Sequence, residues 1–176
     1  MCVRHRSHGA VNAAWVYRPW HRLVCPRHQQ AGPDPRLDRT VRTWAVPELA
    51  AVHHSHQRLL RHPGGVSAWM AARAITTGWY DHQQHLTGRW HHCLNQLVMA
   101  SPHLNHAGGA SPARLARDLV AYPETVALAR TLAALPPTTN RTTNDTLALI
   151  AHQLSLARLA PAVNDPLRAF LTHTRL

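Results

Sequence analysis

The sequence predicts a mainly α-helical protein in which a small N-terminal β-hairpin precedes a bundle of about six or seven helices. Beyond residue 47, apolar residues recur at helical spacing in segments that start at capping residues and stop at Pro or Gly. Before residue 36, two Cys-x-x-His pairs flank a segment rich in strand-forming residues. We therefore expect two domains, a hairpin over residues 1–36 and a helical domain over residues 47–176.

The N-terminal hairpin is predicted from residue preferences. Val11 to Tyr17 contains Val, Trp and Tyr, which favour strands, and Arg18-Pro19 interrupts this run. Trp20 to Val24 then leads into Cys25 as the second strand. The Gly and Pro residues between Gln29 and Arg36 predict a loop after the hairpin.

Pro and Gly residues delimit the first three predicted helices. Pro47 suits the first position of a helix over 47–62, and Pro63-Gly64-Gly65 ends it. The Pro63-Gly64-Gly65 segment is also a candidate for the turn of a helix-turn-helix DNA-binding motif. Val66 to Thr77 is predicted as the second helix and Tyr80 to Ala100 as a third helical stretch.

Capping residues delimit the helices of the second half. After a loop over 101–110, Ser111 and Pro112 predict the start of a helix that reaches Val120. Pro123 opens the next helix, and 136–144 is predicted as an exposed loop. We expect two further helices, one capped by Asp145 that runs to about Leu159 and a final one that starts at Asp165-Pro166.

The two Cys-x-x-His pairs supply the ligands of one zinc ion. Cys2, His5, Cys25 and His28 offer two thiolates and two imidazoles, which close a tetrahedral site and leave no position for a reacting water. We therefore expect structural Zn²⁺ in a zinc-ribbon-like hairpin. Two alternatives stay open for the first pair: His8 in place of His5, or a Cys-x-x-Cys pair whose first member precedes Cys2.

The remaining histidines and the third cysteine are interpreted as structural. Two groups of His fall on predicted helices, and in a chain with 16 His we expect both to be polar surface positions: His53, His54, His56 and His62; His82, His85, His91 and His92. Cys93 is interpreted as a helical packing residue. The sequence contains no paired carboxylates, phosphate-binding loop or nucleophile elbow, so we predict neither an enzyme nor a small-molecule substrate.

The charge of the chain favours a polyanionic partner. The net charge is +11, and all 19 basic residues other than His are Arg. Arg without Lys is typical of GC-rich coding, but such coding also supplies Asp and Glu, of which the chain has 8. Because Arg18, Arg22 and Arg27 alternate with aromatic residues near the predicted zinc site, we predict that these three bind DNA.

The expected location is the cytoplasm. The sequence has no apolar run long enough to cross a membrane and no N-terminal signal pattern, so no membrane partner is predicted. Three cysteines do not make a disulfide framework, and their spacing favours metal in a reducing compartment.

The second Cys-x-x-His pair carries a family resemblance. The stretch Tyr17-Arg18-Pro19-Trp20-His21-Arg22-Leu23-Val24-Cys25-Pro26-Arg27-His28 resembles TniQ-type proteins, and so does the helix start at Ala121-Tyr122-Pro123-Glu124. The resemblance spans about residues 1–135 and is specific only at Cys25 to His28. It implies a zinc ribbon followed by helices, and a transposition target-selection adaptor with DNA, an ATPase or a transposase as partner. The family's second zinc pair is missing here.

Two alternative functions stay open beside this one. A zinc ribbon can serve as a protein–protein interaction module that does not bind DNA. The missing zinc pair also fits a degenerate transposon remnant.

Overall fold

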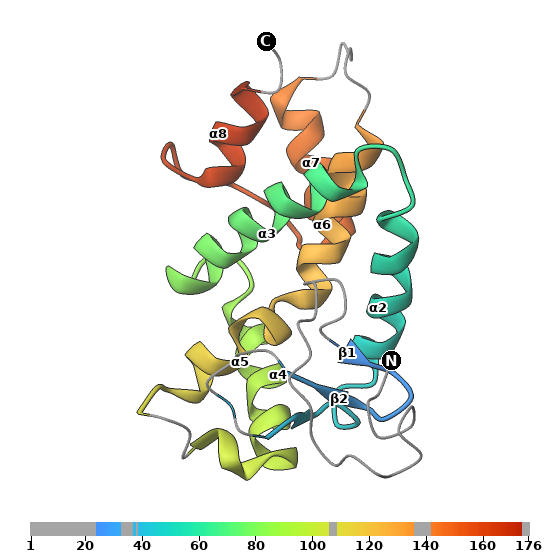
Figure 1. The fold of residues 1–176 in the computed structure, drawn as a ribbon. Coiled ribbons are helices and arrows are strands. Elements are labelled where there is room, and N and C mark those ends of the chain that lie inside the picture. The colour runs from blue at the N-terminus through green and yellow to red at the C-terminus, as the bar shows by residue number, and fades with distance from the viewer. Residues whose placement is uncertain (1–23, 33–36, 38, 106–108, 136–141, 174–176) are drawn as a thin grey trace.

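The computed structural model describes residues 24–32, 37, 39–105, 109–135 and 142–173. Within these ranges the protein is mainly α-helical, and a small three-stranded antiparallel sheet precedes the helices (Figure 1), as predicted. The predicted strands over residues 11–23 lie outside the described residues. The elements are β1 (Val24–Cys25), β2 (Gln30–Ala31), β3 (Val41–Arg42), α2 (Glu48–Leu59), α3 (Gly65–Asp81), α4 (Thr87–Ala100), the 3₁₀ helix η2 (Pro102–Asn105), α5 (Pro112–Val120), α6 (Tyr122–Ala134), α7 (Thr143–Gln153) and α8 (Pro166–His173).

Helix α6 is the centre of the helical packing. Figure 1 shows α6 between α3 on one side and α2 on the other, and both helices pack against it. Its buried residues come from more than one face, including Tyr122, Leu128 and Ala129. A helix that is buried nearly all round belongs in the core of a domain. None of the described helices is long and apolar enough to cross a membrane.

The sheet packs onto the same core. β1 and β2 form a hairpin, and β2 pairs with β3, with Ala31 opposite both Val24 and Val41. These three apolar side chains are at most 3% exposed and belong to the same hydrophobic cluster as the helices. Because side chains alternate across a strand, Cys25, Gln30 and Arg42 share the opposite, outer face.

The third predicted helical stretch, Tyr80 to Ala100, is wrong at its start. Helix α3 continues through Gly78 to Asp81, and α4 begins only at Thr87. Two residues of the intervening turn, Gln83 and His85, have positive φ values of 53° and 59°. A left-handed backbone at these residues is incompatible with a helix, so the chain turns here and α4 takes a new direction.

Three smaller predictions also need correction. Gln30 and Ala31 form a strand inside the predicted loop, because their backbone pairs with β1 and β3. Asp145 is not the N-cap of α7. Thr142 is, and the Asp145 carboxylate accepts the Thr142 N–H in a capping box. Helix α7 ends at Gln153, and Ser155 has a φ of 53° just after it.

The turn between α2 and α3 requires glycine. Gly64 has a backbone φ of 76°, a value that residues with a side chain rarely adopt. A Cβ atom on Gly65 would overlap the carbonyl group of Leu59. The predicted stop at Pro63-Gly64-Gly65 is therefore confirmed, with the close approach of two chain segments as its physical reason. Helices α2 and α3 both pack on α6.

Two buried carboxylates join helices that are distant in the sequence. The Trp79 indole N–H donates to both carboxylate oxygens of Asp165 at 3.1 and 3.0 Å, and His85 Nε2 lies 3.1 Å from the same carboxylate. The Leu167 N–H completes this set at 2.8 Å, so Asp165 also caps α8. Similarly, Glu124 on α6 accepts from Arg89 and from the Trp90 indole at 3.1 and 3.2 Å.

Replacing Asp165 tests the first of these junctions. We expect Asp165→Ala to lower the free energy of unfolding by about 3 kcal/mol, because it leaves buried donors without their acceptor. The matched control is Asp81→Ala, since Asp81 forms an ion pair with Arg117 but its side chain is 47% exposed. That variant should lose less than about 1 kcal/mol. Urea denaturation measures the free energy of unfolding of both variants. Equal losses of stability in the two variants would contradict a stabilising role for the Asp165 junction.

Candidate metal and nucleic-acid site

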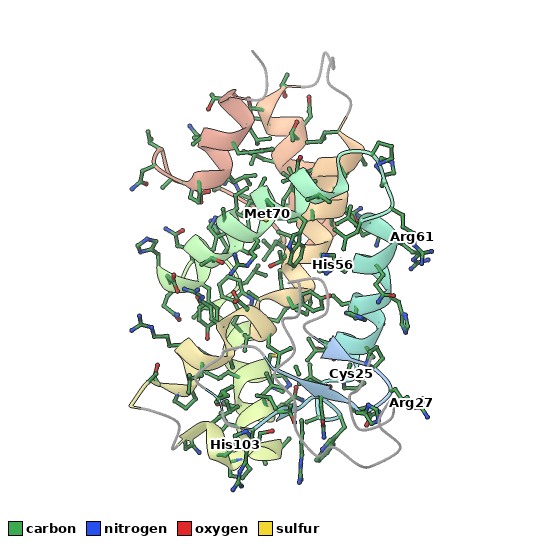
Figure 2. The ribbon with its side chains drawn as sticks, viewed as in Figure 1. Cys25, Arg27, His56, Arg61, Met70 and His103 are labelled. Atoms are coloured by element: carbon green, nitrogen blue, oxygen red, sulfur yellow. The ribbon has the colours of Figure 1, made fainter. Side chains whose placement is uncertain are left out.

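Cys25 and His28 come together in the turn of the β1–β2 hairpin. Cys25 is the last residue of β1, and the His28 N–H donates to the Cys25 carbonyl at 3.2 Å. Gln29, with a φ of 48°, lets the chain reverse into β2. As a result, Cys25 Sγ lies 3.3 Å from His28 Nδ1. Figure 2 shows Cys25 at this end of the sheet, beside Arg27.

The distance between these two hydrogen-bonded atoms is also compatible with both of them being ligands of one zinc ion. With Zn–S near 2.3 Å and Zn–N near 2.0–2.1 Å, two ligand atoms of a tetrahedral zinc lie about 3.6 Å apart. A separation of 3.3 Å between a thiol and an imidazole therefore suits the metal with little adjustment. A zinc ion here would be held by Cys25 and His28 and would fix the hairpin turn.

The other two predicted ligands, Cys2 and His5, lie outside the described residues. Among the residues that the structure does describe, no group of three or more His, Cys, Asp and Glu side chains could hold a metal. The described part of the chain thus contributes Cys25 and His28 to the predicted site.

The outer face of the sheet is basic. Of the three arginines predicted to bind DNA, Arg27 is exposed in the hairpin turn, whereas Arg18 and Arg22 lie outside the described residues. Sequence analysis missed Arg42, which is exposed on β3 opposite Gln30. The two-residue alternation of a strand could have identified Arg42 as an outward-facing residue only if the register of β3 had been known. The described residues between 24 and 46 include no carboxylate.

The outward face of α2 continues this basic character. His54, Arg58 and Arg61 are exposed and stand three or four positions apart, so they form one row along the helix and its C-terminal end. In Figure 2, Arg61 and Arg27 lie along the same side of the molecule. The carboxylate on α2 is Glu48, in its first turn.

The prediction that His53 and His56 are surface residues is wrong. Their exposed fractions are 3% and 0%, and both rings face the Tyr122 hydroxyl, with Nδ1 to oxygen distances of 3.3 and 2.8 Å. Trp69 also stacks on His56, with ring centroids 3.9 Å apart. His56 stands in the apolar series of α2 with Leu49 and Leu59, and this signal could have identified it as a core residue.

His82 and His85 do not form a metal-binding pair on a helix. Both lie at the turn after α3, where His85 contacts the buried Asp165 carboxylate. The His85 ring also packs edge-on against Trp79. His85 is therefore part of the junction that holds α8, and the carboxylate beside it comes from a residue 80 positions away.

Cys93 is a packing residue, consistent with its interpretation from sequence. It is 7% exposed on α4, and burial, with Glu124 nearby, raises the pKa of its thiol to about 12. A thiol that keeps its proton at neutral pH is a poor nucleophile and a poor metal ligand. Cys25 is thus the better candidate ligand of the two described cysteines.

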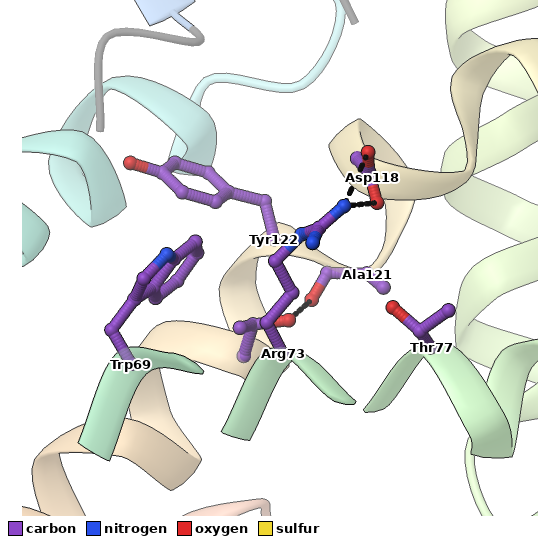
Figure 3. A pocket seen from close by; sticks show the side chains of 7 residues that line it. Trp69, Arg73, Thr77, Asp118, Ala121 and Tyr122 are labelled. Atoms are coloured by element: carbon purple, nitrogen blue, oxygen red, sulfur yellow. Dashed lines mark hydrogen bonds and ion pairs between the residues drawn. The ribbon is translucent and has the colours of Figure 1, made fainter. Parts of the chain in front are cut away.

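A pocket lies between α3 and the α5–α6 corner. Figure 3 shows Trp69, Arg73 and Thr77 of α3 facing Asp118 and Tyr122. Arg73 and Asp118 form an ion pair at 3.3 Å, and the Tyr122 hydroxyl is turned toward the histidines of α2. Arg73 and Asp118 pair with each other and the Tyr122 hydroxyl bonds outside the pocket, so we assign the pocket a role in helix packing.

Zinc content tests the candidate metal site. The purified protein should contain one zinc per chain, and Cys25→Ser should release it and loosen residues 1–30 while the helices stay formed. Cys93→Ala is the matched control and should retain the metal.

His5→Ala should weaken zinc binding and His8→Ala should not. Elemental analysis and circular dichroism measure both effects, and zinc content that is indifferent to Cys25 and His28 would contradict the site.

The buried thiol predicts a loss of stability in alkali. The ordinary thiol pKa is 9.0, but the folded protein holds the Cys93 proton up to about 12. Tyr80, whose pKa burial raises from 10.0 to about 12, acts in the same direction. The free energy of unfolding should therefore fall as pH rises from about 9 to 12. Urea unfolding at several pH values should show a shallower fall in Cys93→Ala, and an unchanged slope would exclude a contribution from this thiol.

No family model, curated protein sequence or solved structure matches this chain. Any proposal for the function of this protein therefore has to be argued from the chain's own residues and from the resemblance at Cys25 to His28.

Proposed function

We propose that this chain is a non-enzymatic, zinc-stabilised DNA-binding protein that serves as an adaptor in transposition. One observation carries the proposal: Cys25 Sγ and His28 Nδ1 lie 3.3 Å apart in a hairpin turn that also exposes Arg27. A metal bound at this turn would hold a basic loop in one conformation. Rigid presentation lowers the entropy lost when the loop binds a phosphate backbone.

The distribution of charge supports a polyanionic partner. Three carboxylates are paired with donors inside the fold: Asp118 and Glu124 accept hydrogen bonds from Arg, and Asp165 accepts one from Trp. Their negative charge is therefore neutralised or bonded within the helical core. The hairpin and the outward face of α2 keep their arginines directed toward solvent. The net charge of +11 favours association with a polyanion, and these exposed arginines are available to bind it.

The adaptor role follows from the resemblance to TniQ-type proteins. In this proposal the zinc is structural, because four protein ligands leave no open position for chemistry. The helical core supplies a rigid support, and a transposition ATPase or a transposase is the protein partner. The residues proposed to contact DNA are Arg27 together with Arg18 and Arg22.

A salt titration of duplex binding tests this function. Binding should weaken steeply with salt, because each arginine–phosphate pair releases counterions from DNA. Replacing Arg18, Arg22 and Arg27 together by Ala should reduce the slope of log K against log salt by about 0.9 for each phosphate that the variant leaves unneutralised. Fluorescence anisotropy with a labelled duplex provides the measurement.

A second triple variant separates specific binding from net charge. Arg130 on α6, Arg158 in the connection between α7 and α8, and Arg168 on α8 are exposed, and their replacement by Ala removes the same charge. This control should retain nearly the wild-type slope. Wild-type protein without measurable duplex affinity at low salt would exclude DNA binding and favour the protein-interaction module, which should then capture a partner ATPase or transposase.

A further inference from the structure

Trp44 differs from the other tryptophans that the structure describes. Its exposed fraction is 56%, whereas Trp69, Trp79 and Trp90 are 6%, 0% and 2% exposed. Aromatic side chains gain the most from leaving water, so an indole held in solvent loses a large part of that gain. A single exposed apolar residue needs no explanation by itself, and the surroundings of Trp44 decide its meaning.

Trp44 lies in the turn that follows β3, next to the hairpin turn that carries Arg27. Gln30 is opposite Arg42, and the Thr43 N–H donates to the Gln29 carbonyl at 2.8 Å, so the residue before Trp44 is bonded to the last residue of the β1–β2 turn. The exposed Arg27 is two residues before Gln29, and the exposed Arg42 is two residues before Trp44, so both arginines belong to these two bonded segments.

The backbone that carries Trp44 is fixed on several sides. The Arg42 N–H donates to the Ser101 hydroxyl at 2.8 Å, which attaches β3 to the end of α4. The Val46 N–H donates to the Thr43 carbonyl at 3.0 Å and closes the chain after Trp44. Val41 and Thr43, which precede Trp44 in the chain, are 0% and 5% exposed and anchor this segment in the core. The indole is thus presented from a turn that follows an anchored strand.

We propose that Trp44 is a stacking platform for an unpaired base of single-stranded DNA, with Arg27 and Arg42 binding the adjacent phosphates. This inference rests on the proposed DNA-binding function and names the form of DNA that is bound. An exposed indole near exposed arginines is suited to a base and its phosphates together, since every base has a face that can stack. The sequence from residue 24 to residue 46 holds four Arg and two Asp, and this net positive charge favours a polyanion over a basic protein partner.

Equilibrium binding of a fluorescein-labelled oligo(dT) tests the platform, with a labelled duplex measured in parallel. Trp44→Ala should raise the Kd for the single strand about 5- to 150-fold, the range expected for removal of one base–aromatic stack. The Kd for the duplex should change less than about twofold, because paired bases are not available for stacking. Trp44→Phe should keep most of the affinity but lose part of the quenching of tryptophan fluorescence that oligo(dT) causes.

Met70 on α3 provides the matched control. It is also 56% exposed, so Met70→Ala removes an apolar side chain of equal exposure from a different surface, and it should leave both affinities unchanged. Equal loss in Met70→Ala, or wild-type affinity of Trp44→Ala for oligo(dT), would overturn the platform while duplex binding by the wild type still supports the proposed function. If the wild type binds neither form of DNA, the proposed function itself fails.

Discussion

The fold depends on the pairing of two buried carboxylates. A carboxylate removed from water is costly unless charged or polar donors surround it. Asp165 receives the Trp79 indole, His85 and a backbone N–H, and Glu124 receives the Trp90 indole and Arg89. Each set joins segments far apart in the chain, so the positions of α8 on α3 and of α4 on α6 are fixed by hydrogen-bond direction as well as by apolar packing.

The same demand for pairing shapes α2. His53 and His56 face the Tyr122 hydroxyl on α6, and Trp69 of α3 covers His56. These contacts set the rotation of α2 about its axis and so determine which residues point outward. Arg58 and the positions beside it are left on the solvent side because the polar histidines occupy the inner side.

In the sheet, register links stability to the candidate site. Val24, Ala31 and Val41 must share the core side, because a shift of one residue would expose all three. The alternation of a strand then sends Cys25 and Arg42 outward, and the turns that carry His28 and Trp44 follow directly after β1 and β3. The burial of a few small apolar residues therefore positions the segments that carry the proposed metal ligands, the basic residues and the exposed indole. These segments are the part of the molecule on which the proposed functions depend.

The sequence by itself determined the helical class, most helix boundaries and the local pairing of Cys25 with His28. These features depend on neighbours in the chain: Ser111 caps α5 and Gly64 ends the turn before α3 through local backbone geometry alone. Only the tertiary structure decided the turn at Gln83 to His85, the burial of His53 and His56, and the exposure of Trp44. Each depends on a partner distant in sequence, such as Asp165, Tyr122 or β2, and periodicity within one segment carries no information about such partners.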